Sequence, residues 1–557
     1  MNHPADLETA PSAMGSDRAI PISRAIWAAS IGTAFEWYEF ALYGSLATVL
    51  AAKFFSGVEA GTAFIFALLT FAVGFMMRPL GALVFGRIGD MIGRKRTFVV
   101  TICMMGVATV GVGCLPTYAS IGITAPIVLI CLRILQGLAA GGEYAGALTY
   151  VAEYSTSRRR GLNMSWTTAA TTAGLLLSFV VILAARELSG DGFDVWGWRL
   201  PFIGSIIMLA ISLAMRLRME ESPAFRKLLH NKQLSKSPIR ETFLDAANFR
   251  RLVVAFSLCA GMTSMYYMAA LYPTFFLTQT LKVDPKTVNT VVLLATAVCL
   301  PMFPISGWLC DRIGRKPALL IGFATTAALL FPVFHGFEHF ANPALASAQA
   351  AAPITVETDA SRCSLLFNPL GNRRFTSSCD TAKQALAAAG VSYSVEDKGS
   401  AATTTVIRIG NGTLTGYSAA GLTAPAAKAQ ATHFAGQLRE LLTAQGYPAH
   451  SDPAAFNGPM VFALLVVFFS CSIITVMTIG PALVEMFPTR IRYTSMSVPY
   501  NAATGWVGGL LPTFVFAISA QTGNIFSGLW YPLGWTGVSL IALILFFRET
   551  RDVNIND

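Results

Sequence analysis

Long blocks of apolar residues, separated by short polar stretches, run along most of the chain. Twelve blocks are long enough to cross a bilayer as helices, because about 20 apolar residues span roughly 30 Å of hydrocarbon. They cover residues 25–52, 62–86, 97–116, 122–152, 162–185, 198–217, 252–279, 288–310, 317–337, 458–485, 494–519 and 527–547. Blocks of this length exclude a membrane β-barrel, whose strands are shorter. The pattern predicts an all-α polytopic membrane protein with twelve transmembrane helices.

Residues 338–456 break this pattern, since they are rich in Ala, Ser and Thr and contain no spanning block. Short apolar runs predict strands there, and two longer stretches closed by glycine predict helices. The strands are expected at Ile354–Val356, Val391–Val395 and Thr404–Ile409, and the helices at Asp380–Ala389 and Ala426–Ala444. We therefore expect a small α+β insert. If it faces an oxidising compartment, its two cysteines, Cys363 and Cys379, are expected to form a disulfide.

The lysines and arginines collect in alternate polar stretches, notably after the second, fourth, sixth and eighth blocks. Loops rich in Lys and Arg stay in the cytoplasm, so both termini are expected there, in a cell inner membrane. The expected organisation is a disordered cytoplasmic tail (1–22), an N-terminal six-helix half (23–217), a cytoplasmic linker (218–250), helices 7–9 (251–337), a periplasmic insert (338–456), helices 10–12 (457–547) and a cytoplasmic tail (548–557).

Composition agrees with a membrane protein, since 54% of the residues are hydrophobic and 13% are charged, against roughly 25% charged in soluble domains. The net charge of +10 does not indicate nucleic-acid binding, because the basic residues lie in short clusters between spans. The nine cysteines have no metal-ligand spacing, and no catalytic constellation or phosphate loop is present. The sequence thus predicts neither an enzyme nor a cofactor, and oligomeric state is open.

Two stretches of the chain nearly copy each other. Gly86-Arg-Ile-Gly-Asp-Met-Ile-Gly-Arg-Lys95 and Gly307-Trp-Leu-Cys-Asp-Arg-Ile-Gly-Arg-Lys316 lie 221 residues apart. A second pair of landmarks, Glu153 with Arg160 and Glu485 with Arg492, lies 332 residues apart. The two offsets differ by 111 residues, which matches an insertion into the second half at 338–456. Repeated halves are a transporter architecture, with the substrate site between the halves near the membrane midplane.

Several motifs narrow the family. The repeated loop and Arg133-x-x-Gln136-Gly137 resemble the major facilitator superfamily. Further runs resemble its metabolite:proton symporter family: Glu36-Trp-Tyr-Glu-Phe40, Leu42-Tyr-Gly44, Arg78-Pro-Leu-Gly81, Gly141-Gly-Glu143, Trp198-Arg-Leu-Pro-Phe202, Glu221-Ser-Pro223 and Glu485-Met-Phe-Pro-Thr-Arg490. The resemblance implies proton-coupled uptake of a small organic metabolite such as 2-oxoglutarate, citrate, shikimate, proline or betaine. Glu39 stands where the family usually has Asp, and the insert exceeds the usual loop.

Charged residues inside the predicted spans are candidates for the transport site. A charge at mid-bilayer costs about 2.5–3.5 kcal/mol, so it needs a partner or a function. Such residues lie on one face of the first predicted span and on one face of the fourth, and both faces are expected to line a central cavity. Arg78 lies at the end of the second span. We expect proton coupling at Glu36, Glu39, Glu143 and Arg133, and substrate binding at Arg78, Arg133, Gln136, Tyr38 and Tyr43. Permanent Arg–Glu pairs that only fix helix packing are the alternative.

The repeated loop motif is expected to form a gate between the halves. Its aspartates can accept hydrogen bonds from a helix N-terminus, and its arginines can clamp a neighbouring helix end. The resemblance implies the same role. The expected gate residues are Gly86, Asp90, Gly93 and Arg94 in the first copy, and Gly307, Asp311, Gly314 and Arg315 in the second. Kinks are expected at Pro301, Pro304, Pro499 and Pro512.

Two other functions share parts of this pattern. A proton-coupled efflux antiporter has the same fold, but efflux members carry a Gly-x3-Gly-Pro signature in span 5, and residues 161–186 contain no proline. A metabolite-binding sensor would need an output module, for which the short polar stretch after the last span offers no room. The same short stretch lacks the heptad extension of osmosensing betaine carriers, which favours an organic acid as the metabolite.

Overall fold

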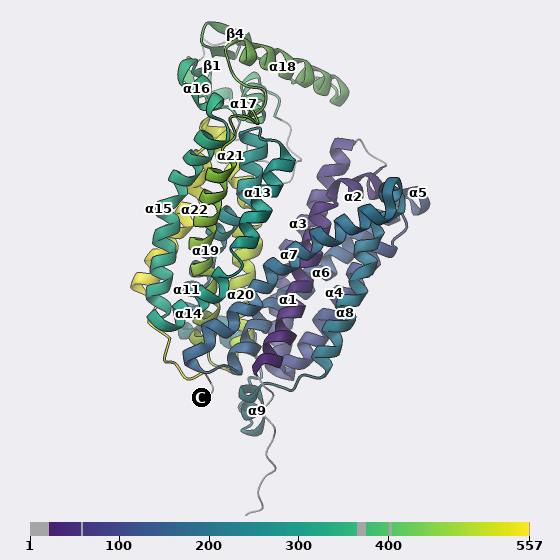
Figure 1. The fold of residues 1–557 in the computed structure, drawn as a ribbon, viewed down its shortest axis with the longest axis vertical. Coiled ribbons are helices and arrows are strands. Elements are labelled where there is room, and N and C mark those ends of the chain that lie inside the picture. Colours follow the sequence, from purple (N-terminus) through teal and green to yellow (C-terminus); the bar gives the residue numbers. More distant parts are fainter. Residues whose placement is uncertain (1–21, 57–59, 365–374, 400–403, 556–557) are drawn as a thin grey trace, which may run out of the picture.

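The computed structural model describes residues 22–56, 60–364, 375–399 and 404–555. Its helices form two bundles that meet at one end and diverge toward the other, where a small sheet caps one bundle (Figure 1). We name the end that carries Asp90 and Asp311 the loop-motif end, and the opposite end the sheet end. The tail expected at 1–22 lies outside the described residues except for Ile22.

Eight α-helices build the N-terminal half. They are α1 (Ile22–Ser45), α2 (Ala47–Phe54), α3 (Ala60–Ile92), α4 (Arg94–Cys114), α5 (Tyr118–Ile121), α6 (Thr124–Glu153), α7 (Arg160–Ser189) and α8 (Arg199–Leu217). The short turns η1 (Ser157–Arg159), η2 (Gly190–Gly192) and η3 (Phe193–Gly197) connect the last three. Helix α1 packs on α7, and α3 packs on α6.

The linker holds α9 (Pro223–His230) and α10 (Pro238–Leu244), and the C-terminal half follows. Its helices are α11 (Ala246–Ala270), α12 (Tyr272–Phe275), α13 (Pro285–Val298), α14 (Met302–Ile313), α15 (Arg315–Ala341), α19 (Gly458–Met486), α20 (Arg492–Ala502), α21 (Leu511–Thr522) and α22 (Trp530–Leu545). The turns η4 (Phe276–Thr280), η7 (Ala503–Gly508) and η8 (Ser527–Leu529) extend α12, α20 and the start of α22.

Capping residues set where several of these helices begin. Asp245 accepts a hydrogen bond from the backbone N–H of Asn248 at 2.9 Å, and Asp284 accepts one from Thr287 at 2.9 Å. Asp284 and the cap Asn457 are each followed by a proline at the start of the helix. These side chains satisfy N–H groups that the first helical turn leaves without partners.

One bend lies at a proline where a kink is expected, and the other prolines expected to kink helices lie within helices. Helices α13 and α14 meet at 41° around Pro301, so the segment predicted as one span at 288–310 is broken. Pro499 lies inside α20, and Pro512 lies in the first turn of α21 after the π-helical η7. A proline removes one backbone donor and clashes with the preceding turn, which explains the breaks.

The outer surface of both halves is apolar. Ile206, Ile207 and Ile211 are exposed along α8, and Ile541 and Ile544 along α22, with Ile207 64% exposed. A contiguous exposed apolar surface of this kind belongs in a membrane. Among the described residues, nine helices are long and apolar enough to span it, or ten if α13 and α14 form one span. Helices α1 and α3 fall outside that count, so twelve spans stay a prediction.

Small residues let α3 and α6 approach closely. A Cβ atom on Gly137 would overlap the backbone of Gly74, and one on Gly141 would overlap the carbonyl of Arg78. The sequence pattern of small residues four apart is typical of such helix contacts. Through these contacts Arg78 of α3 lies beside Gly141, and the guanidinium of Arg133 from α6 lies beside Gly74.

The described part of residues 343–444, named here the sheet region, adds a four-stranded sheet and three α-helices at the sheet end. The helices are α16 (Pro343–Ala351), α17 (Ser378–Ala389) and α18 (Ala424–Ala444), and the strands are β1 (Ile354–Thr358), β2 (Ser394–Asp397), β3 (Val406–Ile409) and β4 (Gly412–Thr415). Strand order is β2-β1-β3-β4, with β1 parallel to β2 and antiparallel to β3. Helix α16 and strand β4 were not expected from the sequence.

Candidate functional site

Glu36 and Arg78 form a buried ion pair between α1 and α3. Arg78 Nη2 donates to Glu36 Oε1 at 2.7 Å, and the arginine is 2% exposed. Its guanidinium also lies 4.5 Å from the ring centroid of Phe40. The second carboxylate oxygen of Glu36, Oε2, is buried and accepts no hydrogen bond from the described residues. An open acceptor in an apolar interior is costly unless a proton, water or ligand occupies it.

Arg133 in α6 lies between α1 and α4. Its Nη1 lies 3.5 Å from Glu39 Oε1 and donates to Gln136 Oε1 at 2.7 Å. Gln136 in turn donates to Thr109 Oγ1 at 3.1 Å. The guanidinium also lies 4.3 Å from the ring centroid of Tyr43. Three residues that the sequence singled out, Glu39 and Tyr43 of α1 and Gln136 of α6, therefore surround one arginine.

Glu143 pairs with Arg216, a residue that the sequence analysis did not include. Both terminal nitrogens of Arg216 donate to this carboxylate, one of them to Oε2 at 2.9 Å, and Thr101 Oγ1 donates to Oε2 at 3.0 Å. Glu143 thus faces α4 and α8, whereas we expected it to face a central cavity with Arg133. Arg216 supplies the counter-charge from the last turn of α8. An arginine in the last turn of an apolar span is the signal that could have found it.

All three Arg–Glu pairs lie in the N-terminal half. In the described helices of the C-terminal bundle, no ion pair joins Arg to Glu or Asp away from the loop-motif end, although Arg408 pairs with Glu357 in the sheet at 3.0 Å. Pairing cancels much of the cost of each charge in the membrane. A buried pair still gains little net stability, because both ions lose their hydration, and removal of one partner is strongly destabilising. Packing alone is therefore a weak reason for three such pairs.

A small cavity lies between the two halves, beside the first of these pairs. Its volume is about 20 Å³, which accommodates about one water molecule. Aromatic and hydroxyl side chains from both halves line it, namely Trp37, Tyr144, Thr168, Thr171, Thr263, Tyr266, Tyr267, Tyr500 and Thr504, together with Met262 and Val476. Tyr144 stacks on Tyr500 across the two halves, with ring centroids 4.8 Å apart.

The cavity is close to the charges but does not include all residues expected at a binding site. Tyr267 and Tyr500 lie within electrostatic range of both Arg78 and Glu36. Tyr38, by contrast, donates its hydroxyl to Pro201 O of α8 at 2.7 Å, on the side away from the C-terminal half. Tyr43 donates to Ala67 O at 3.3 Å. The tyrosines that do line the cavity are dispersed over three helices, so no local spacing could reveal them.

The first copy of the loop motif joins α3 to α20 of the other half. Asp90 accepts hydrogen bonds from the backbone N–H groups of Tyr493 at 3.1 Å and Thr494 at 2.9 Å. Arg94 donates to Thr489 O at 3.0 Å and lies 3.4 Å from Glu153. Arg492 donates to Glu153 at 3.1 Å. A Cβ atom on Gly86 would lie 2.8 Å from Thr494 Cα, so the two helices touch there.

The second copy joins α14 to α7 in the same way. Asp311 accepts hydrogen bonds from the backbone N–H groups of Gly161 and Leu162, both at 2.9 Å. Arg315 donates to Glu485 Oε1 at 3.0 Å, and Arg160 donates to the same oxygen. A Cβ atom on Gly307 would lie 2.7 Å from Gly161 O. Each aspartate thus caps a helix of the opposite half, and the two halves are closed at this end.

A glycine starts the helix after each motif. Gly93 and Gly314 have φ angles of 118° and 98°, which L side chains rarely adopt. Glu221 accepts a hydrogen bond from Arg94 N at 2.9 Å, and Glu549 accepts one from Arg315 N at 2.9 Å. Burial acts to raise the pKa of Glu549, but backbone N–H donors, chiefly those of Arg315 and Lys316, hold it below its usual value. Each carboxylate anchors the segment that follows the last long helix of its half, α8 or α22.

Comparison with known proteins assigns the family. The family profile described as Major Facilitator Superfamily matches residues 29–346, which is more than half of the chain. The chain belongs to the major facilitator superfamily. This family consists of multi-pass membrane permeases, so the protein is not an enzyme, and the resemblance in the loop motifs is confirmed.

Relatives of this permease are named as transporters. It is 37% identical over 324 residues to a glycine betaine/proline/ectoine/pipecolic acid transporter of Dickeya dadantii, covering 56% of this chain and 64% of that protein. It is 35% identical over 322 residues to the proline/betaine transporter of Escherichia coli K12, with the same coverage. The permease thus spans less than two thirds of the relatives' length. These bacterial relatives are consistent with an inner-membrane protein.

Solved structures support the fold of the permease. The proton:xylose symporter XylE bound to 6-bromo-6-deoxy-D-glucose has a TM-score of 0.60 and 14% identity, covering 96% of this chain and 98% of that chain. The inward-open xylose transporter XylE from E. coli has a TM-score of 0.53 and 15% identity. At these identities the likeness concerns the fold alone.

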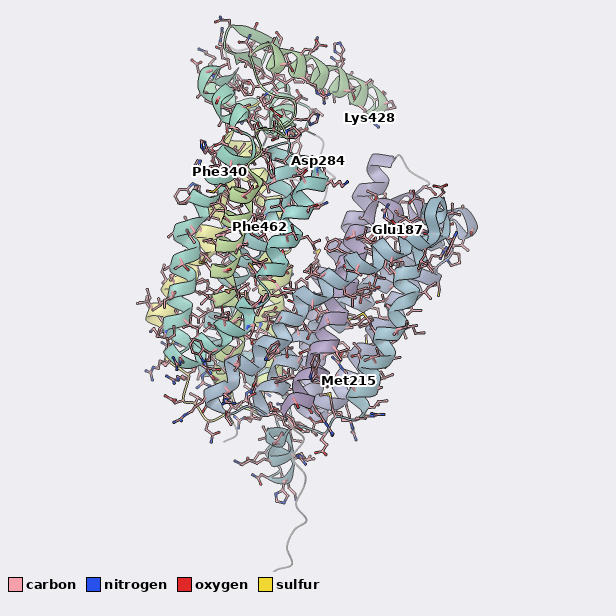
Figure 2. The ribbon with its side chains drawn as sticks, in the orientation of Figure 1. Glu187, Met215, Asp284, Phe340, Lys428 and Phe462 are labelled. Carbon is pink, nitrogen blue, oxygen red and sulfur yellow. A yellow bond between two sulfur atoms is a disulfide. The ribbon has the colours of Figure 1, made fainter. Side chains whose placement is uncertain are left out.

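The sheet region of the permease docks on the C-terminal half. Tyr393 N donates to Gly523 O at 2.6 Å, and Ser451 N donates to Lys282 O at 3.1 Å. Cys363 and Cys379 are joined by a disulfide. The first part of α18 reaches past these contacts, with Lys428 near its free end on the side of the N-terminal half (Figure 2). The region therefore has the C-terminal half as its base.

Proposed function

We propose that this permease is a metabolite:proton symporter, which couples uptake of a small organic solute with a carboxylate group to inward proton movement. One observation carries the proposal. The buried Glu36–Arg78 pair lies beside the cavity between the halves, and Glu36 Oε2 has no hydrogen-bond partner among the described residues. An intramembrane ionisable pair in such a place is functional by default.

The open oxygen of Glu36 supports this residue as the proton acceptor. When Glu36 Oε2 takes a proton, the carboxylate loses its charge and its hold on Arg78 weakens. The guanidinium is then available for another carboxylate, and its planar donors suit a bidentate contact. Arg78 would thus be shared between the coupling glutamate and the solute. Proton binding and solute binding favour each other in this scheme.

The lining of the cavity supports a solute with both a carboxylate and a cationic nitrogen. Trp37, Tyr266 and Tyr267 present aromatic rings, and such rings attract quaternary ammonium and other cations. Arg78 acts electrostatically on Tyr267, one of these residues, and is our candidate for binding the carboxylate. The relatives are named for proline and betaine, which are zwitterions of this type. A zwitterion thus has more support than the organic acid that the sequence favoured.

Alternating access follows from the closed contact at the loop-motif end. The cavity of about 20 Å³ cannot hold a metabolite, so a solute requires the halves to separate. The Asp90 and Asp311 contacts are the bonds that would break when this end opens. They are hydrogen bonds to helix ends, which can break and form again as the halves separate and meet. We assign the gate to both motif copies.

The topology that we propose has twelve spans, with both termini and the loop-motif end in the cytoplasm. The basic residues of both motif copies at this end support that orientation. Residues 338–456 would then form an α+β insert in the periplasm, where an oxidising environment suits the Cys363–Cys379 disulfide.

Uptake of labelled solutes tests the proposal. Cells that express the permease would receive glycine betaine, proline, 2-oxoglutarate, citrate or shikimate, with and without a protonophore. We expect accumulation of a zwitterion that collapses with the protonophore and is lost in Glu36→Gln. Glu338→Gln is the matched control, because its ion-pair partner among the described residues, His335, is 56% exposed at the sheet end of α15.

Two outcomes would contradict this function. Faster loss of a preloaded solute from expressing cells would establish an efflux antiporter. Saturable binding to purified protein without any transport in vesicles would favour a metabolite sensor. Accumulation of citrate or 2-oxoglutarate with no effect of betaine would keep the symporter and reject the zwitterion.

A further inference from the structure

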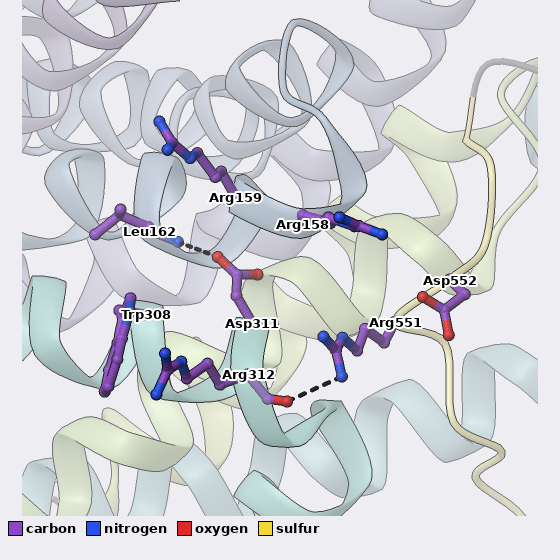
Figure 3. Close-up of a pocket in the computed structure, with 8 residues that line it drawn as sticks. All are labelled: Arg158, Arg159, Leu162, Trp308, Asp311, Arg312, Arg551 and Asp552. Atoms are coloured by element: carbon purple, nitrogen blue, oxygen red, sulfur yellow. Dashed lines mark hydrogen bonds between the residues drawn. The ribbon is translucent and has the colours of Figure 1, made fainter.

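A pocket rich in arginine lies where the two halves meet at the loop-motif end (Figure 3). Its volume is about 670 Å³. Arg158 and Arg159 come from η1 of the N-terminal half, Arg312 comes from α14 of the C-terminal half, and Arg551 follows α22. The pocket exists in this form only while the halves are in contact, because both contribute to its wall.

The pocket has more positive charge than its own carboxylates can balance. Asp311 lines it, but its oxygens already accept from Gly161 N and Leu162 N, and it pairs with Arg315 at 2.9 Å. Asp552 is the other acidic residue of the wall. Against these two stand four arginines, so the pocket keeps a net positive charge and suits an anion.

The arginines also keep donors that are not used. Within the described part of the chain, the side chains of Arg158 and Arg159 have no hydrogen bond or ion pair. Arg551 donates through Nη1 to Arg312 O at 2.9 Å, but its Nε is buried without an acceptor in the described residues. Arg312 lies over the ring of Trp308 at 4.6 Å, which leaves the edge of its guanidinium open. These groups would gain hydrogen bonds from a ligand with several anionic oxygens.

We propose that this arginine pocket binds a phosphate-bearing anion that bridges the two halves. Guanidinium groups bind phosphate oxygens in pairs and more selectively than they bind a spherical anion. Basic pockets between membrane helices hold phospholipid head groups in this way. The exposed Trp308 on the wall is the residue type that lies at a membrane–water boundary. A phospholipid head group and a soluble phosphate share the required chemistry.

The bridge has a consequence for transport that rests on the proposed function. An anion that contacts Arg158 and Arg312 together binds the closed form of this end and not the separated form. Differential binding of this kind shifts the population toward the closed form. The anion would therefore slow the opening of the gate and lower the rate of uptake, without contact with the solute.

Binding by the whole protein in nanodiscs tests the pocket without any transport. Phosphatidylcholine nanodiscs would be titrated with inorganic pyrophosphate, and nanodiscs of mixed phosphatidylcholine and phosphatidylglycerol would be analysed for retained lipid by native mass spectrometry. We expect Arg158→Gln/Arg312→Gln to weaken binding about five-fold for each arginine. Arg218→Gln is the control, because Arg218 is exposed beyond α8 and does not line the pocket.

The two arms separate the sources of the anion. Pyrophosphate binding in phosphatidylcholine that is lost in the double variant assigns a soluble phosphate, and retained phosphatidylglycerol that is lost in the double variant assigns a lipid. Equal binding by the wild type and the double variant in both arms would overturn the proposal. So would binding that Arg218→Gln weakens as much as the double variant does. Because no solute is involved, failure here leaves the symport proposal untouched.

Discussion

In the N-terminal half, Asp90 caps the start of α20 across the interface, and in the C-terminal half Asp311 caps the start of α7. The partners repeat as well, since Arg94 with Glu153 matches Arg315 with Glu485. At this end the two halves are built alike.

The buried side chains inside the helix bundles differ between the halves. The N-terminal half holds Glu36, Glu39 and Glu143, each with an arginine partner. The described spans of the C-terminal half contribute instead tyrosines and threonines to the cavity, among them Tyr267 and Thr504. The comparison teaches that the two halves share their contacts where they meet, whereas the buried glutamates with arginine partners lie in one half.

The largest effect is expected when this asymmetry is broken at Glu36 and Arg78. Arg78→Gln leaves a buried carboxylate without its partner, which costs about 3–5 kcal/mol of stability, and uptake should fall more than a hundred-fold. Glu36→Gln should abolish proton-driven accumulation of the solute. Combining both changes should restore much of the unfolding temperature but not the uptake, because the charge is removed together with its partner.

Thermal unfolding in detergent and uptake into vesicles would measure both effects. Glu440→Gln, an exposed residue of α18, controls for the loss of a carboxylate. If Arg78→Gln retained wild-type stability and transport, the pair would have no part in coupling.

The sequence predicted the repeated end better than the interior. Each loop motif is local, so contacts of Asp90 and Arg94 with a neighbouring helix end could be expected from the motif, and the structure brings both residues to the interface. Glu143 with Arg216 shows why the interior was harder. Both residues could be seen in their helices, but which arginine meets which glutamate depends on how α6 and α8 pack.

The sheet region shows a second limit of the sequence. Strands β1 and β3 have buried alternate residues, and apolar runs predicted them at Ile354–Val356 and Thr404–Ile409. Strand β4 (Gly412–Thr415) has no buried residue, so it lacks an apolar signal. Its register comes from pairing with β3 at the sheet edge.

If both halves contribute to the gate, substitution of Asp90 or Asp311 should have a smaller effect than substitution of Arg78. The effect should be the same for the two aspartates. In Asp90→Asn and Asp311→Asn, a neutral amide replaces a charged acceptor of two N–H groups, and hydrogen bonds to charged groups contribute about 1.5–3 kcal/mol. Each variant should open the loop-motif end more often and lower uptake about ten-fold.

Spin labels on the two halves would report the separation, and labelled solute would report uptake. If Asp311→Asn transported solute normally while Asp90→Asn was inactive, one half alone would control the gate. The similarity of the two motif copies would then be structural only.

The smallest effect is expected at Glu549, which anchors the segment after α22 to the start of α15. Its pKa lies below the usual value near 4.5, since backbone N–H groups stabilise the carboxylate despite its partial burial. The stability that it contributes is therefore complete above the ordinary pKa and is lost as the pH falls through the lower folded pKa. Because the side chain is largely exposed, we expect Glu549→Gln to cost at most about 1 kcal/mol at neutral pH.

Unfolding temperatures of the wild type and Glu549→Gln should converge as the medium is acidified below about pH 4. If the two curves of unfolding temperature against pH stayed parallel down to acid pH, the charge of Glu549 would not stabilise the hydrogen bonds to Arg315 and Lys316. The start of α15 would then tolerate a neutral side chain as its cap.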